Sequence, residues 1–132
     1  MRNTLNPGAR FLFWGAINAA LAVMLGAFGK HALMSVLSER MMETWRTGAY
    51  YHLVHALALV LVSVVVERSS QPDRVVIAGW LLLAGVVLFS GSLYLLALTE
   101  FRPLGIVTPL GGVCFLLGWF WLARSALPGA SS

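Results

Sequence analysis

Four long runs without Asp, Glu, Lys or Arg constrain this chain more than any other feature of its sequence. They cover residues 11–29, 49–66, 75–98 and 104–123, so each holds 18 to 24 residues. A helix needs about 20 residues to cross the ~30 Å hydrocarbon core of a bilayer. The runs lack the alternating pattern of barrel strands, and a helix satisfies its own backbone hydrogen bonds in lipid. The sequence therefore predicts four membrane-spanning helices.

The composition agrees with a chain that is surrounded by lipid. Apolar residues make up 59% of the 132 residues and charged residues only 11%, whereas a soluble domain has about 25% charged residues. The nine cations are scattered singly between the apolar runs, so they form no basic stripe for nucleic acid. We therefore expect the lipid bilayer as the main partner and no binding of nucleic acid.

Short connections join the four runs. They cover residues 30–48, 67–74 and 99–103. Links of this length make consecutive helices antiparallel neighbours. The expected fold class is therefore all-α: an integral membrane four-helix bundle with up-down-up-down topology, in a single domain over residues 1–132.

The connection at 30–48 carries a pattern of its own. Apolar residues recur at every fourth position from Leu33 to Trp45, with charged residues between them. This period predicts a short amphipathic helix that lies in the membrane interface between the first two spans. Because tryptophan is common at membrane interfaces, Trp45 is expected near one membrane surface and Trp119 near the other.

The distribution of cations predicts an orientation. The side that holds both termini carries five of them: Arg2, Arg10, Arg68, Arg74 and Arg124. The opposite side carries four: Lys30, Arg40, Arg46 and Arg102. Cytoplasmic loops are richer in Lys and Arg, so the sequence predicts that both termini are cytoplasmic.

Histidines and one asparagine form the first candidate cluster for binding a ligand. His31 follows the first run, and His52 and His55 lie on one face at the start of the second. Converging imidazoles bind metal or haem, carry protons, or bond to neighbouring helices. The spacing lacks a partner cysteine or a carboxylate within a span, which favours structural hydrogen bonds. Asn18 is expected to face inward, because an amide in hydrocarbon needs a partner.

Small and polar residues in the last two runs form the second candidate group. They are Ser90, Gly91, Ser92 and Tyr94 in the third run, and Thr108, Pro109, Gly111 and Gly112 in the fourth. Proline lacks the N–H that would bond the carbonyl four residues earlier, so a helix break or kink is expected at Pro109. Interrupted helices line substrate sites in transporters, but small residues more commonly let helices pack closely.

The fourth run holds two pairs of glycines that recur at a spacing of seven. The pairs are Gly105 with Gly112, and Gly111 with Gly118. They give this helix two faces for close contact with other helices. No nucleophile elbow, Walker loop or dinucleotide fingerprint is present in the sequence. We therefore expect no enzyme and no cofactor, but an interaction bundle that docks other membrane subunits or a second copy of itself. The alternatives are a transporter or channel for small molecules or ions, and a haem- or metal-binding membrane protein.

Four strings in order along the chain resemble one known family. They are GAFGKHAL at 26–33, WRTGAYYHLVHALAL at 45–59, FSGSLYLLALT at 89–99 and LGIVTPLGGV at 104–113. These strings resemble the domain of unknown function 423 family, which includes transmembrane protein 256. The resemblance implies a four-span inner-membrane protein with no assigned activity, and it carries over no catalytic residue.

Overall fold

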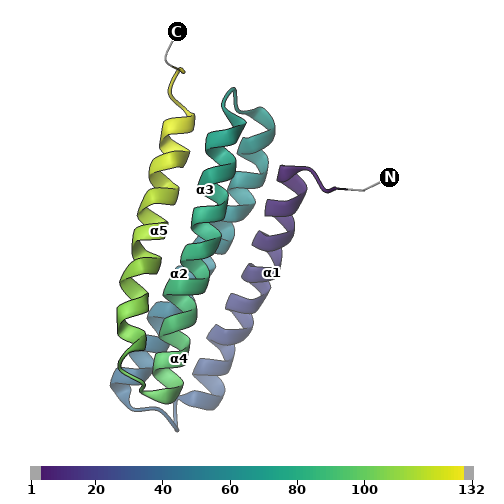
Figure 1. Ribbon diagram of the computed structural model, residues 1–132. Helices are drawn as coiled ribbons and strands as arrows, with labels where there is room; N and C mark the ends of the chain where they lie inside the picture. Colours follow the sequence, from purple (N-terminus) through teal and green to yellow (C-terminus); the bar gives the residue numbers. More distant parts are fainter. Residues whose placement is uncertain (1–3, 130–132) are drawn as a thin grey trace.

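The computed structural model describes residues 4–129, which fold into four antiparallel helical spans without a strand among them (Figure 1). All four spans are long and apolar enough to cross a bilayer. This confirms the expected all-α, four-helix membrane bundle. Two spans contain a π-helical turn, labelled η1 and η2. The elements are α1 (Pro7–Phe28), η1 (Gly29–Leu33), α2 (Glu39–Arg68), α3 (Pro72–Gly85), η2 (Val86–Ser90), α4 (Gly91–Thr99) and α5 (Leu104–Ser125).

Local sequence signals explain where the helices begin and end. Asn6 caps α1 by accepting a 2.8 Å hydrogen bond from the Ala9 N–H, and Ser38 caps α2 in the same way. Side-chain oxygens of Asn and Ser are preferred at this position because they satisfy free N–H groups of the first turn. Pro72 occupies the first turn of α3. Glu100 ends α4 in the left-handed region with φ of 52°.

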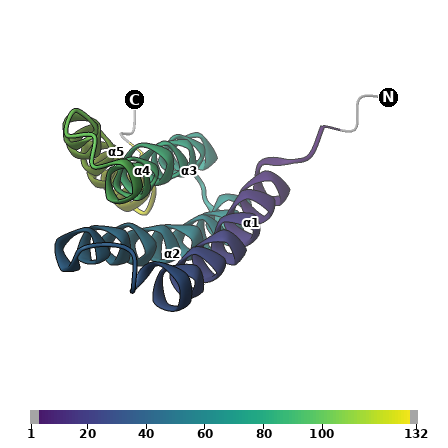
Figure 2. The same cartoon turned by 90° about the horizontal axis from the view of Figure 1, so that it is seen from below.

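The helices form two layers (Figure 2). In one layer α1 packs along α2, and in the other α5 packs along the third span, which consists of α3, η2 and α4. Contacts between α2 and the third span hold the layers together. Nowhere in residues 4–129 does a Cα atom of α2 come within 8 Å of one of α5. The bundle is therefore open along the seam between α2 and α5.

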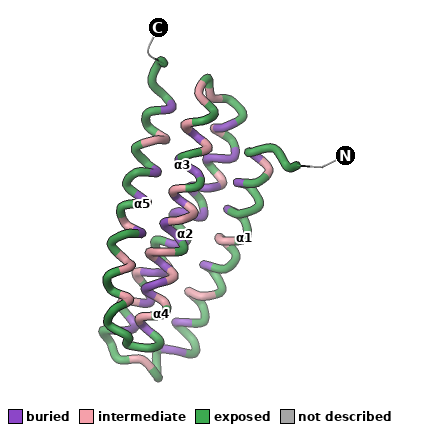
Figure 3. The backbone as a smooth tube through the Cα atoms, in the orientation of Figure 1, coloured by how far each residue is buried: buried purple, intermediate pink, exposed green. Residues whose placement is uncertain are grey.

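Buried residues lie on the sides of the helices that face one another, and the outer sides are exposed (Figure 3). The main apolar cluster contains Phe11, Leu59, Val62, Leu82 and Phe115, so every span contributes to it. The share of buried residues within the membrane window is 44% for α2 and 39% for the third span, but 22% for α1 and 17% for α5. The two inner spans therefore form the core, and α1 and α5 present most of their surface to the surroundings.

The expected interfacial helix does not exist as a separate element, and this prediction was wrong. The π turn η1 extends the first span, a short turn follows, and α2 then runs without a break for 30 residues. The apolar period was real, but its residues Leu33, Met41 and Trp45 are buried between the spans. Trp45 is only 2% exposed, so it does not belong to an interfacial belt. Apolar packing therefore draws this segment into the bundle.

The positions of the charged loops follow the predicted topology. Arg10, Arg68, Arg74 and Arg124 lie at the end of the bundle where α1 begins and α5 ends (Figure 1). Arg2, which contributes to the predicted orientation, lies outside the described residues.

The π turn η2 packs against glycines of two neighbouring helices. A Cβ on Gly111 of α5 would lie 2.3 Å from the backbone N of Phe89. On the other side, a Cβ on Gly48 of α2 would lie 3.4 Å from the carbonyl oxygen of Ser90. A π turn is wider than an α turn because its hydrogen bonds span five residues. Glycines on the neighbouring helices leave room for it.

We predict that Gly111→Ala lowers the free energy of unfolding by about 1–3 kcal/mol, because the added methyl group meets backbone that cannot move aside. The control is Gly105→Ala in the same helix, where a Cβ meets nothing within 4 Å. That change should leave stability unchanged or raise it slightly through helix propensity. Reversible unfolding in bicelles measures both variants, and equal effects would contradict the packing described here.

Candidate functional site

The polar residues of the spans meet in hydrogen bonds between helices, and His52 of α2 is central among them. Its Nε2 lies 2.9 Å from Oδ1 of Asn18 on α1. Its Nδ1 lies 2.9 Å from the hydroxyl oxygen of Tyr94 on α4. His52 is buried. One imidazole thus connects three spans.

The partners of His52 define its tautomer. The Asn18 side chain donates from Nδ2 to the carbonyl oxygen of Trp14 at 2.8 Å. Its Oδ1 is therefore the acceptor, and His52 must donate to it from Nε2. A neutral imidazole that is protonated on Nε2 accepts at Nδ1, so the Tyr94 hydroxyl donates. Both ring nitrogens of His52 and the hydroxyl proton of Tyr94 then have a partner.

His55 lies one turn further along α2 and holds the fourth span. Its Nδ1 donates to the carbonyl oxygen of Tyr51 at 2.8 Å. Its Nε2 accepts from the indole Nε1–H of Trp119 on α5 at 3.1 Å. The imidazole also stacks on the ring of Phe115, with a centroid distance of 3.6 Å. His55 is therefore neutral with the proton on Nδ1, the opposite tautomer to His52.

This arrangement leaves neither imidazole free to bind another group. A metal ligand needs an unprotonated ring nitrogen with a free lone pair, whereas both lone pairs here accept hydrogen bonds. His31 lies on η1 and is exposed, so the expected convergence of three histidines is wrong. Residues 4–129 contain no group of three His, Cys, Asp or Glu side chains arranged to hold a metal ion. The geometry favours hydrogen bonding between helices over coordination.

A second polar bridge joins the last two spans. The Ser92 hydroxyl of α4 donates to the carbonyl oxygen of Phe89 at 2.9 Å. It lies 2.6 Å from the hydroxyl oxygen of Thr108 on α5. The Thr108 hydroxyl also lies 3.4 Å from the carbonyl oxygen of Leu104 in its own helix, so either hydroxyl can donate in the bond between them. The adjacent Ser90 is fully buried, and its hydroxyl is the one buried side-chain polar atom without a partner in the described part of the chain.

The expected interruption lies in the third span and not in the fourth. Helix α5 continues through Pro109 from Leu104 to Ser125, so the predicted break there was wrong. Pro109 is exposed and lies in the second turn, inside the helix, where its missing N–H removes the bond to the carbonyl oxygen of Gly105. The irregular turn is η2, which ends at Ser90. A Cβ on Gly91, which follows this turn, would meet nothing within 4 Å. A Cβ on Gly112 would lie 3.9 Å from the ring of Phe89.

Sequence reasoning missed two tryptophans that act as donors between helices. Trp119 binds His55, although its position suggested the membrane interface. Trp45 donates from its indole to the carbonyl oxygen of Leu25 at 2.9 Å, and it packs on Gly29, where a Cβ would lie 2.4 Å from the indole nitrogen. The spacing of Phe115 and Trp119 was the available signal, because residues four apart share one helix face.

Comparisons with known proteins show which family this chain resembles in sequence. Residues 25–112 match the family model described as protein of unknown function DUF423. A curated relative, the UPF0382 membrane protein YwdK of Bacillus subtilis, is 47% identical over 117 residues, which cover 89% of this chain and 95% of the relative. The UPF0382 membrane protein SERP0230 of Staphylococcus epidermidis is 45% identical, with 89% and 94% covered. No solved structure matches the chain.

We predict that Asn18 and His52 are energetically coupled. Asn18→Leu and His52→Leu should each lower stability by about 1–2 kcal/mol, because each leaves a buried partner unsatisfied. The double variant should lose less than the sum, by on the order of 1 kcal/mol. Unfolding in bicelles provides the four free energies, with His31→Leu as the exposed control. Strict additivity would contradict the hydrogen bond.

The two buried serines should respond differently to alanine. Ser92→Ala should destabilise the protein by about 1 kcal/mol, because the hydrogen bond between Ser92 and Thr108 is lost. Ser90→Ala removes a hydroxyl that bonds to nothing, so stability should stay the same or increase. The same unfolding assay compares them, and a larger loss at Ser90 than at Ser92 would show that this assignment is wrong.

Proposed function

Because this chain belongs to the DUF423 family of proteins of unknown function, whose curated relatives are named as membrane proteins, we propose a non-enzymatic role for it. The bundle is an interaction module that docks a transmembrane helix of another membrane subunit, or of a second copy, on the outer face of α5. The single observation that carries this proposal is a pair of glycines on α5 that the bundle itself does not use.

The two glycine pairs of α5 lie in different surroundings. Gly111 and Gly118 face the third span, where a Cβ would lie 2.3 Å from the backbone of Phe89 and 2.8 Å from the side chain of Leu82. This pair therefore packs against another span of the same chain. At Gly105 a Cβ would meet nothing within 4 Å, and at Gly112 it would meet only Phe89, at 3.9 Å. The second pair is therefore open to a partner.

The surroundings of this open pair suit a helix. Residues seven apart lie on the same side of a helix, so Gly105 and Gly112 form one shallow face. Apolar side chains that are more than half exposed, Ile106, Leu110 and Val113, flank it. Small residues let two backbones approach closely enough for van der Waals contact and weak hydrogen bonds, which drive helix association in lipid.

The internal polar groups also support an interaction role over transport. A substrate path needs polar groups that can exchange partners with the substrate. Asn18 and His52 bind each other, and both nitrogens of His55 are occupied. The bundle uses these groups to join its own helices.

The proposal includes a location. We place the chain in the inner membrane with both termini in the cytoplasm. The excess of five cations over four on the terminal side of the sequence supports this orientation.

Cysteine cross-linking in native membranes tests the docking face. In a Cys114→Ser background, Gly105→Cys and Gly112→Cys should each form a cross-linked species that contains this chain. The control is Val23→Cys on α1, which is 61% exposed and lies in the opposite layer. Cross-links at Val23→Cys as strong as those on α5 would contradict the proposal. Ion or metabolite flux in liposomes that Asn18→Leu abolishes would support a transporter instead.

A further inference from the structure

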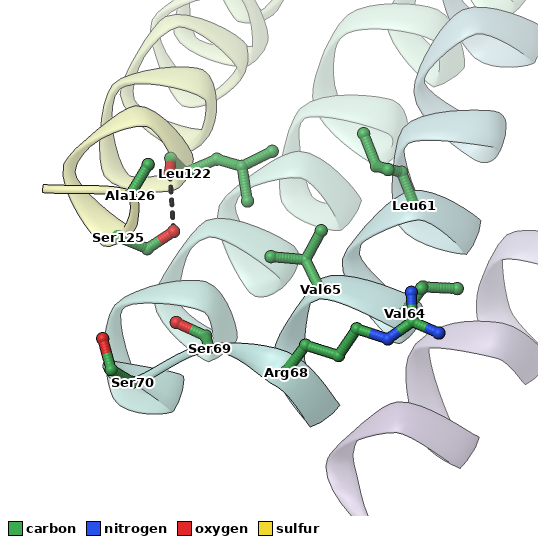
Figure 4. A pocket seen from close by; sticks show the side chains of 9 residues that line it. All are labelled: Leu61, Val64, Val65, Arg68, Ser69, Ser70, Leu122, Ser125 and Ala126. Carbon is green, nitrogen blue, oxygen red and sulfur yellow. Dashed lines mark hydrogen bonds between the residues drawn. The ribbon is translucent and has the colours of Figure 1, made fainter.

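The open seam between α2 and α5 contains a slot at the end of the bundle where the chain termini lie. Beyond the bond between His55 and Trp119, the two helices leave a cavity of about 640 Å³ (Figure 4). Its walls are aliphatic: Leu61, Val64 and Val65 come from α2 and Leu122 from α5. In a bilayer this slot opens toward lipid chains, because α2 and α5 both present exposed outer sides.

The rim of the slot is polar and carries a cation. Arg68, the last residue of α2, is among the residues that line the slot (Figure 4). Ser69, Ser70 and Ser125 complete the rim. The Ser69 oxygen accepts a bond from the Gln71 N–H at 3.0 Å, which leaves its proton free to donate. The slot is thus aliphatic along its length and offers hydrogen-bond donors at its end.

The charges around the rim favour an anion. Arg74 donates to the carbonyl oxygen of Arg124 at 2.8 Å, so two more cations lie at this end of the bundle. Glu67 is directed to α1, since its Oε1 would lie 2.3 Å from a Cβ on Gly8. Asp73 is in the first turn of α3 and does not line the slot. The carboxylates at this end therefore do not occupy the rim.

We propose that this slot binds an anionic phospholipid. One acyl chain lies between α2 and α5 against Leu61, Val65 and Leu122, and the phosphate lies at Arg68 and the adjacent serine hydroxyls. Arginine binds phosphate oxygens with two parallel N–H bonds, and basic sites between transmembrane helices recognise anionic headgroups. The site is separate from the Gly105 and Gly112 face, so it does not depend on the proposed docking role.

The position of the polar rim matches the order of the groups in a lipid. Arg68 is the last residue of α2, so its guanidinium lies at the level where a membrane-spanning helix meets the headgroups. A lipid places its charge at that level and its apolar chain below it, which is the order of groups along the slot.

Native mass spectrometry tests the proposal on the full chain. The protein is purified in detergent and incubated with equal amounts of dioleoyl phosphatidylglycerol and dioleoyl phosphatidylcholine, which share their acyl chains. We expect one retained phosphatidylglycerol, favoured at least threefold over phosphatidylcholine. Arg68→Gln should remove this preference. Arg102→Gln at the opposite end of the bundle should preserve it.

A second variant tests the apolar part of the slot. Leu61→Trp fills the space from an already half-exposed position, and it should reduce retention of both lipids while the helical circular dichroism stays unchanged. An excess of inorganic phosphate should not displace the lipid, because the acyl chain contributes most of the binding. Equal retention of the two lipids by the wild type, or an unchanged preference in Arg68→Gln, would overturn the proposal. Displacement by phosphate would overturn it as well.

Discussion

A polar side chain in the hydrocarbon core of a membrane has no water to bind, so it must find a partner in the protein. The rest of this structure depends on how two histidines meet that requirement. His52 connects α2 to α1 and α4, and His55 connects α2 to α5. Together they join all four spans through one helix. Association of helices in lipid lacks a hydrophobic driving force of its own, and such bonds supply the orientation that apolar contacts alone do not.

The same requirement explains why the bundle is asymmetric. The inner pair, formed by α2 and the third span, holds most of the buried residues, including both buried histidines. Helices α1 and α5 each pack against this pair. The π turn η2 widens the third span in its middle, and Gly48 and Gly111 make room for it. The fourth span contacts α2 through side chains that include Phe115 and Trp119. As a consequence, the seam between α2 and α5 is open. The two ends of this seam present different surfaces to the membrane.

Much of this fold could be predicted from sequence. The four runs without charged residues predict the spans, because their lengths match the thickness of the bilayer. The short links predict the topology, because they make consecutive helices antiparallel neighbours. The beginning of α2 could not be found in this way: the apolar period from Leu33 to Trp45 predicts a separate interfacial helix. Packing of Met41 and Trp45 against the first span instead makes this segment the start of α2. The pairing of His55 with Trp119 also depends on tertiary structure. A spacing of three places His52 and His55 on one helix face, but it does not say that they bond to different helices.

The central claim is that both buried histidines are neutral and locked in opposite tautomers. Nitrogen NMR of the protein labelled with ¹⁵N-histidine, in lipid nanodiscs at neutral pH, tests it most directly, since the two ring nitrogens of each tautomer have distinct chemical shifts. We expect one slowly exchanging histidine protonated at Nε2 and one protonated at Nδ1. Imidazolium signals from the buried pair, or averaging between tautomers, would contradict it.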